Sequence, residues 1–154
     1  MSDDRHTCPL TRGENILVAL DGSSNSDFAL EQAFSMANTC SSMLYAITVI
    51  DAYPIQIEGA PGVKEKMEKE ALEMLQKVGA KAKGKNINCE TILRWERSPH
   101  AAILKEAKDR GADLIVLGSH GKTGLMKLIL GSVAQKVIGY ARCPVMVVPS
   151  EHNL

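Results

Sequence analysis

The fold is decided by the stretch Ile16-Leu17-Val18-Ala19-Leu20-Asp21-Gly22-Ser23-Ser24. Its apolar part is a short continuous run, which is typical of a strand buried on both faces of a sheet. Asp21 and Gly22 stop the run, and Ser23 or Ser24 can cap a following helix. Apolar residues then recur at intervals of three and four over 28–37, so the stretch predicts a strand that leads directly into an amphipathic helix.

The same alternation continues along the chain. The other strand patterns lie at 43–50, 87–93, 114–117 and 145–148, and the other helical patterns lie at 64–83, 99–110 and 132–141. Only the 87–93 pattern alternates apolar and polar residues, which suits an edge strand. Because strands alternate with helices, we predict an α/β fold with one doubly wound, five-stranded parallel sheet in the Rossmann-like order 3-2-1-4-5 and helices on both faces.

Composition limits the classes of protein and partner. Of 154 residues, 45% are hydrophobic, and 18 Lys and Arg balance 18 Asp and Glu, which fits one globular domain without long-range attraction to nucleic acid or anionic membranes. Residues 1–13 are polar and are predicted to form a flexible arm before a domain at 14–150. The longest apolar run, 43–50, is too short to span a membrane, so we expect a cytoplasmic protein with no nucleic-acid or membrane partner.

The cysteine and histidine patterns indicate neither disulfide bonds nor a metal site. The four cysteines, Cys8, Cys40, Cys89 and Cys143, form no C-x-x-C pair, so we expect four free thiols, with Cys40 and Cys89 as small residues in or near the core. The four histidines lie far apart, which predicts no transition-metal site.

A glycine-rich loop follows the fourth predicted strand. It reads Gly118-Ser119-His120-Gly121-Lys122-Thr123-Gly124, and Gly131-Ser132 then opens the last predicted helix. The spacing matches neither a P-loop nor a dinucleotide fingerprint. Glycines nevertheless let backbone N–H groups approach a phosphate, and a helix start adds further donors. From the residues alone, the loop is either a phosphate site or a mobile turn before a helix cap.

Two side chains near these strand ends also have two interpretations. Asp21 can hold ribose hydroxyls or the Mg²⁺ of a triphosphate, or it can simply form a turn with Gly22. His120 can donate to a phosphate, or it can be a solvated loop side chain.

The spacing of Gly118 and Gly121, followed after nine residues by Gly131-Ser132, resembles the nucleotide-binding signature of the universal stress protein family. The resemblance extends over 14–149 and implies a homodimer of the ATP-binding subclass. In this family the first strand tip borders the adenosine, a valine backbone at the second strand holds adenine, the glycine loop wraps ribose and phosphates, and the last helix start faces the phosphates. The implied site residues are Ala19, Asp21, Val49, Gly118, Ser119, His120, Gly121, Lys122, Thr123, Gly124, Gly131, Ser132, Val133 and Ala134.

The family's dimer forms through the last strand, which is here Val145, Met146, Val147 and Val148. An apolar strand of this kind leaves an unpaired edge unless something covers it. Two positions depart from the family pattern. Thr48 stands where many relatives have histidine, and Arg97-Ser98-Pro99 stands where many have a Gly-x-Pro turn.

The function predicted from these features is an ATP-binding stress-response or regulatory protein. Nucleotide occupancy would bias the 51–62 connection and the dimer surface, with at most slow hydrolysis, because the loop places no arginine or glutamine for it. The alternative is an adenylate-transferring enzyme on a related scaffold, although this chain length leaves little room for substrate elements. A receiver-like module phosphorylated on Asp21 would need clustered acidic residues that the first strand lacks.

Overall fold

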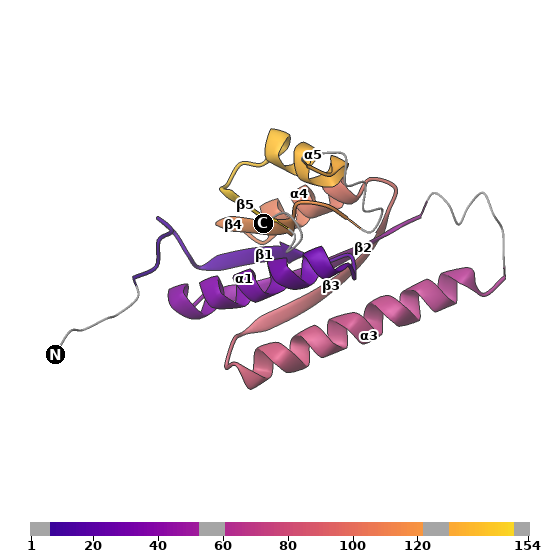
Figure 1. Cartoon of the computed structure of the whole chain (residues 1–154), viewed down its shortest axis with the longest axis horizontal. Coiled ribbons are helices and arrows are strands. Elements are labelled where there is room, and N and C mark those ends of the chain that lie inside the picture. The colour runs from indigo at the N-terminus through magenta and orange to yellow at the C-terminus, as the bar shows by residue number, and fades with distance from the viewer. Residues whose placement is uncertain (1–6, 53–60, 122–129, 150–154) are drawn as a thin grey trace.

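The computed structural model describes residues 7–52, 61–121 and 130–149. These residues form one five-stranded parallel sheet in the order β3-β2-β1-β4-β5, which confirms the predicted fold (Figure 1). The strands are β1 (Asn15–Ala19), β2 (Met43–Asp51), β3 (Cys89–Glu96), β4 (Leu114–Gly118) and β5 (Val145–Val148), and the helices are α1 (Ser24–Cys40), α3 (Val63–Gly84), α4 (Pro99–Asp109) and α5 (Ser132–Tyr140). Most of the predicted 51–62 connection lies outside the described residues.

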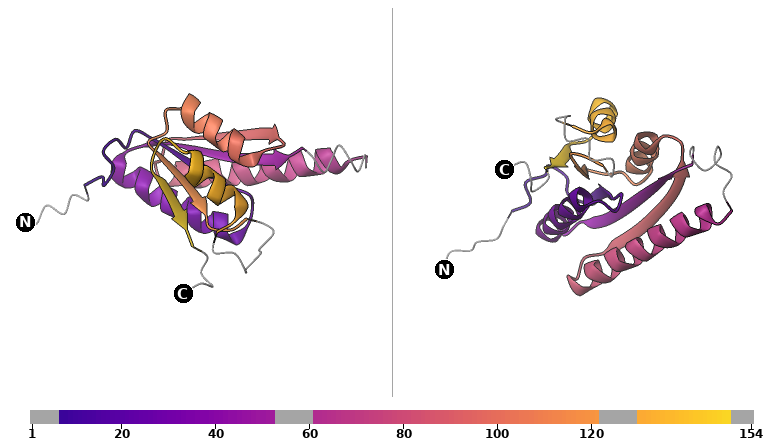
Figure 2. Two further views of the ribbon diagram at one scale, coloured as in Figure 1. Left: turned by 90° about the horizontal axis from the view of Figure 1, so that it is seen from above. Right: turned by 45° about the vertical axis from the view of Figure 1, so that its right-hand side comes forward.

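Helices cover both faces of the sheet. α1 and α3 pack on one face, and α4 and α5 pack on the other (Figure 2). On β1, Ile16 and Val18 face the α1 and α3 layer, whereas Leu17 faces the α4 and α5 layer, and all three side chains are fully buried. Burial on both faces explains why this strand reads as a continuous apolar run. None of the helices in the described ranges is long and apolar enough to cross a membrane.

The helices α1, α4 and α5 begin in different ways. The Ser23 side chain accepts a hydrogen bond from the Ser26 N–H and caps α1, as predicted. α4 begins at Pro99, but Ser98 makes no side-chain capping bond to that helix and instead lies with its Oγ 3.4 Å from His100 Nδ1. α5 is capped by Gly131, so Ser132 is the first helical residue and not the cap.

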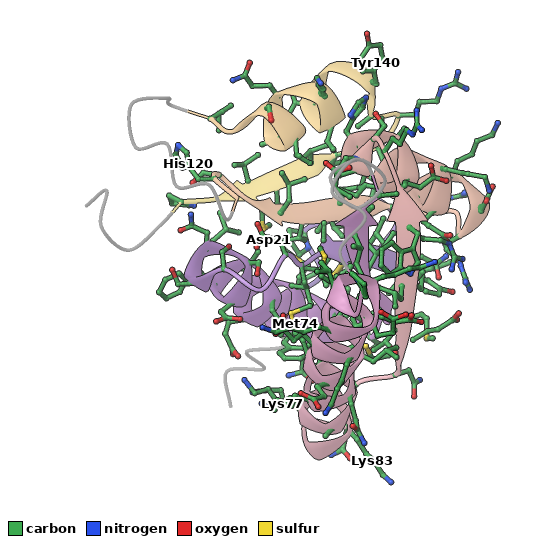
Figure 3. The ribbon with its side chains drawn as sticks, turned by 90° about the vertical axis from the view of Figure 1, so that its right-hand side faces the viewer. Asp21, Met74, Lys77, Lys83, His120 and Tyr140 are labelled. Atoms are coloured by element: carbon green, nitrogen blue, oxygen red, sulfur yellow. A yellow bond between two sulfur atoms is a disulfide. The ribbon has the colours of Figure 1, made fainter. Side chains whose placement is uncertain are left out.

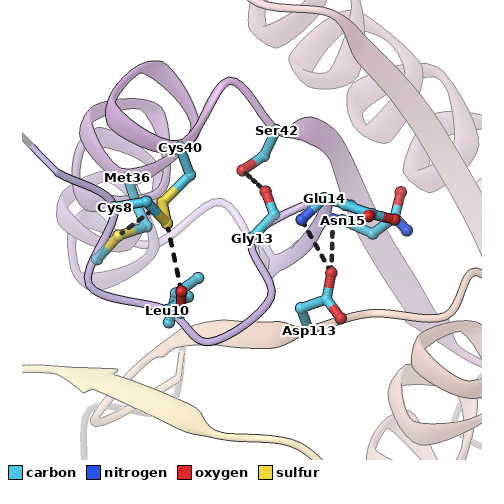
Figure 4. Close-up of a disulfide and its surroundings, with 9 residues drawn as sticks. All are labelled: Cys8, Leu10, Gly13, Glu14, Asn15, Met36, Cys40, Ser42 and Asp113. Carbon is cyan, nitrogen blue, oxygen red and sulfur yellow. Dashed lines mark hydrogen bonds between the residues drawn. A yellow bond between two sulfur atoms is a disulfide. The ribbon is translucent and has the colours of Figure 1, made fainter.

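The expectation of four free thiols is wrong, because Cys8 and Cys40 form a disulfide (Figure 4). α1 runs back along the sheet, so its last residue returns to the amino end of β1 and meets the segment that precedes this strand. The two Cα atoms lie 4.7 Å apart although the cysteines are 32 residues apart in sequence. Cys89 and Cys143 are free and half-buried.

A charged network joins α4 to the edge strand β3. The buried Glu106 accepts hydrogen bonds from Arg94 Nε at 2.6 Å and from Arg110 Nε at 3.4 Å. Arg110 also pairs with Glu90 at 2.8 Å. The buried carboxylate is therefore compensated by two guanidinium groups, and the network holds α4 in place beside β2 and β3.

Candidate functional site

A cavity of about 360 Å³ opens at the carboxyl ends of β1, β2 and β4. This is where the winding of the sheet reverses, since β2 and β4 flank β1. In doubly wound sheets, ligands bind outside the strands at this switch point. Figure 3 shows two of the side chains there, Asp21 after β1 and His120 after β4.

Two turns from opposite ends of the glycine-rich stretch meet at one side of the cavity. The Gly131 N–H donates to the Ser119 carbonyl at 2.7 Å, and the Ser119 N–H donates to the Val148 carbonyl at 2.9 Å. A Cβ on Gly131 would lie 3.3 Å from the Ser119 carbonyl oxygen. Glycine is therefore favoured at 131, where two backbone segments approach closely, and the start of α5 borders the cavity.

Asp21 forms a turn before α1 and also lines the cavity. Its Oδ1 accepts hydrogen bonds from the Ser23 N–H at 2.9 Å and from the Ser23 hydroxyl at 2.6 Å, so one oxygen fixes the turn before α1. Its Oδ2 lies toward the glycine loop, where a Cβ on Gly121 would come within 3.1 Å of it. The turn therefore positions a carboxylate on the cavity wall.

His120 is buried and is not a solvated loop side chain. Its Nδ1 lies 3.0 Å from the hydroxyl of Ser119, which is also buried. Its carbonyl accepts a hydrogen bond from Asn25 Nδ2 at 3.2 Å, which ties the loop to the first turn of α1. A Cβ on Gly118 would lie 3.1 Å from the Asn25 carbonyl oxygen, so this contact also depends on a glycine.

The opposite side of the cavity is apolar. Ile47 and Val49 contribute from β2, and Pro99 and Ile103 contribute from the first turns of α4. β2 and β4 lie on opposite sides of β1, so the apolar wall faces the glycine turns across the end of β1. The cavity can therefore hold a ligand with a flat apolar end and an anionic end.

Every predicted site residue that the structure describes lines this cavity. These residues are Ala19, Asp21, Val49, Gly118, Ser119, His120, Gly121, Gly131, Ser132, Val133 and Ala134. Lys122, Thr123 and Gly124 lie outside the described residues. Within the described ranges, no group of three or more His, Cys, Asp and Glu side chains could hold a metal ion.

Sequence reasoning missed seven lining residues, which are Leu20, Ser26, Ile47, Asp51, Pro99, Ile103 and Leu117. Signals for some of them were present. Asp51 ends the second strand and Pro99 begins the helix after the third strand, so both had to lie at the same end of a parallel sheet as Asp21. Ile103 follows Pro99 by one helical turn.

The sequence from residue 13 to residue 149 matches the model of the Universal stress protein family. The chain belongs to this family. It is 37% identical over 147 residues to universal stress protein MJ0531 of Methanocaldococcus jannaschii, with 90% of this chain and 86% of the relative covered.

Solved structures of family members share its fold. Protein MJ0577 of Methanocaldococcus jannaschii has a TM-score of 0.83 at 29% identity, with 92% of this chain and 99% of that chain covered. The universal stress protein of Archaeoglobus fulgidus, solved in complex with dAMP, has a TM-score of 0.65 at 23% identity, with 88% and 97% covered. At this identity the second likeness shows the common fold.

Proposed function

We propose that this universal stress protein binds an adenine nucleotide, ATP, in the cavity beyond β1, β2 and β4, and that binding is its activity. The observation that carries the proposal is that one cavity gathers all eleven described residues that the glycine signature and strand ends predicted, from Ala19 to Ala134. The adenine nucleotide held by the Archaeoglobus fulgidus relative supports the ligand class.

The two sides of the cavity suit the two ends of such a ligand. The adenine would pack between Val49 and Ile103, where the wall is apolar. The phosphates would lie against Gly121 and Gly131, where a Cβ would fill the space near Asp21 and Ser119, and would face the N–H groups at the start of α5. Asp21 Oδ2 would be the carboxylate nearest the ribose or an Mg²⁺ carried by the triphosphate.

Regulation through a homodimer completes the proposal. β5 forms one edge of the described sheet, and Val145, Met146 and Val147 are only half-buried although they are apolar. An edge of this kind can pair with a second copy about a two-fold axis. Nucleotide occupancy would then act as a conformational signal at the dimer surface of a cytoplasmic protein.

The first experiment identifies the ligand. The purified protein is denatured, the released small molecules are identified by mass spectrometry, and the stripped protein is titrated calorimetrically with ATP, AMP and cAMP, each with and without Mg²⁺. We expect an adenine nucleotide in the extract and one ATP site per chain. An empty extract together with no heat from any of the three nucleotides would contradict the proposal.

Two glycine variants, one at the cap of α5 and one inside this helix, test the location of the site. Gly131→Val places a side chain against Ser119, whereas the Cβ of Gly139→Val, inside α5, meets nothing within 4 Å. We expect the first variant to lower ATP affinity at least ~10-fold, or about 1.4 kcal/mol, and the second to leave it unchanged. Equal affinities would place the nucleotide elsewhere.

The same samples separate binding from chemistry. ADP and phosphate would report hydrolysis, and pyrophosphate together with an adenylylated acceptor would report adenylate transfer. We expect neither product to accumulate during the titration. Pyrophosphate release that increases with the concentration of an added carboxylic acid would favour the adenylate-transferring enzyme over a binding protein.

A further inference from the structure

The disulfide between Cys8 and Cys40 joins the segment before β1 to the last residue of α1 (Figure 4). Both cysteines are half-buried, so the disulfide lies near the surface and not in the core. Gly13 lies directly against the bond, because a Cβ there would come within 2.7 Å of Cys8 Sγ and 2.9 Å of Cys40 Cβ. The backbone of Gly13 is not in the left-handed region, so closeness to the sulfur atoms, and not backbone conformation, is what favours glycine here.

The chain on the other side of Gly13 is held without the disulfide. The Ser42 hydroxyl donates to the Gly13 carbonyl, and Asp113 Oδ2 accepts hydrogen bonds from the N–H groups of Glu14 and Asn15, each at 3.0 Å. β1 then pairs with β2 and β4 along its length. Opening the disulfide would leave these contacts of β1 intact and would remove the covalent link between α1 and the segment 7–12, whose Leu10 packs against the core.

The two free cysteines are less suited to redox chemistry. Burial raises the pKa of the Cys89 thiol to about 11, with a smaller contribution from the Glu90 carboxylate. Burial also raises the pKa of Cys143, with Asp113 adding to the effect. Because the thiolate is the reactive form, both thiols react slowly near neutral pH.

We propose that Cys8 and Cys40 form a reversible oxidation site that fastens the segment 7–12 to α1 when oxidised and releases it when reduced. Oxidation by hydrogen peroxide begins when one thiolate attacks a peroxide oxygen, which breaks the O–O bond and forms a sulfenic acid. The second thiol displaces this hydroxyl as water, so two thiols and one peroxide give one disulfide and two waters. A dithiol reverses the change by supplying two electrons and two protons, and it becomes a disulfide itself.

Counting thiols tests the site in the full chain. Protein treated with hydrogen peroxide or with dithiothreitol is denatured, alkylated with N-ethylmaleimide and analysed by mass spectrometry. We expect two labelled cysteines, Cys89 and Cys143, after peroxide and four after dithiothreitol. Cys8→Ser should prevent oxidation of Cys40 to the intramolecular disulfide, whereas Cys89→Ser should not. Four labelled cysteines after peroxide, or a Cys8 bond to another chain, would overturn the proposal.

Amide hydrogen exchange tests the release. Dithiothreitol should increase exchange at the amides of 7–12 and leave those of 14–19 unchanged, and Cys8→Ser should reproduce the increase without reductant. The Cys89→Ser variant is the control, because it keeps the disulfide. Unchanged exchange at 7–12 on reduction would overturn the inference, as would an equal increase over 14–19. Neither result depends on whether the cavity binds a nucleotide.

Gly13→Ala tests the close packing around the sulfur atoms. A methyl group there conflicts with the disulfide, so we expect about ten times more oxidised dithiothreitol, relative to the reduced form, to be needed for half-oxidation. Gly84→Ala, whose Cβ would meet nothing within 4 Å, is the control. Equal midpoints for Gly13→Ala and the unmodified chain would contradict this placement of the bond.

Discussion

The two ends of the same sheet are built in different ways. At the carboxyl end, β1 and β4 run into turns that touch through backbone atoms and glycines, and a cavity remains between them. At the amino end, a disulfide and the Asp113 carboxylate hold the chain where it enters β1. The unit formed by β1 and α1 therefore has the candidate ligand site at one end and, at the other end, the disulfide and hydrogen bonds that hold the chain before β1. The contrast predicts that changes at the carboxyl end affect binding, and changes at the amino end affect stability.

The largest expected effect is at Gly121. Gly121→Val would place a side chain against Asp21 Oδ2, within 3.1 Å already at the Cβ, so we expect a ~100-fold loss of ATP affinity, or about 2.7 kcal/mol. The midpoint of thermal unfolding without nucleotide should change little, because Gly121 is exposed. Calorimetric titration and thermal unfolding of one sample measure both quantities. A variant that bound ATP normally but unfolded earlier would reverse the contrast.

Asp113 tests the amino end. Asp113→Ala removes the acceptor of two backbone N–H groups, so we expect the free energy of unfolding to fall by about 2 kcal/mol while ATP affinity is kept. Asp109→Ala is the control, because its carboxylate pairs with the exposed Lys105 and its loss should change stability far less. Urea denaturation of both variants provides the measurement. Equal losses would show that Asp113 is not an anchor.

Cys89, at the start of β3, makes the amino end sensitive to alkali. Burial raises its folded pKa to about 11, above the ordinary value of 9.0, so between these pH values the folded state keeps a proton that the unfolded state loses. The contribution of the protonated Cys89 thiol to the free energy of unfolding is complete below pH 9.0 and is lost as the pH rises toward 11. We expect Cys89→Ala to flatten this decline in urea titrations between those pH values. Parallel curves for the variant and the unmodified chain would exclude Cys89 as the source.

The smallest effect is a gain at Thr48. Its Oγ1 is buried and has no hydrogen-bond partner among the described residues. Thr48→Val removes this unpaired hydroxyl at nearly constant volume, so we expect about 1 kcal/mol of added stability. ATP affinity should stay the same, because Thr48 does not line the cavity. A lower affinity would show that a buried β2 residue outside the cavity lining also influences ligand binding.

The fold could be predicted almost entirely from sequence. Continuous apolar runs such as 16–20 indicated strands covered on both faces, and a Pro at position 99 marked a helix start that the structure confirms. Side-chain interactions on exposed helix faces were less predictable. On α3 both Glu65 with Lys69 and Lys66 with Glu70 have the spacing of an ion pair, and the structure pairs Lys66 with Glu70 at 4.0 Å. Several such pairs are geometrically possible on one helix, and spacing alone does not select among them.

The candidate site was predictable where backbone geometry determines it. Gly118, Gly121 and Gly131 each lie where a Cβ would meet another segment, so their spacing records the approach of those segments. Ile47 and Leu117 could not be assigned, because a buried apolar residue looks the same whether it lines a cavity or the core. The disulfide had no signal at all. Cys8 lies in a polar segment, and only the return path of α1 brings Cys40 beside it.

The charged outer strand limits how many copies can join. Glu90, Arg94 and Glu96 lie on β3, and the first two form ion pairs with residues of α4 and Arg110 just after it. Such a strand discourages further strands from adding at its free edge. If two copies join through β5, a β3 strand then lies at each end of the combined sheet. Further chains would then not add at either β3 edge, which predicts a closed dimer and opposes extension into a fibre.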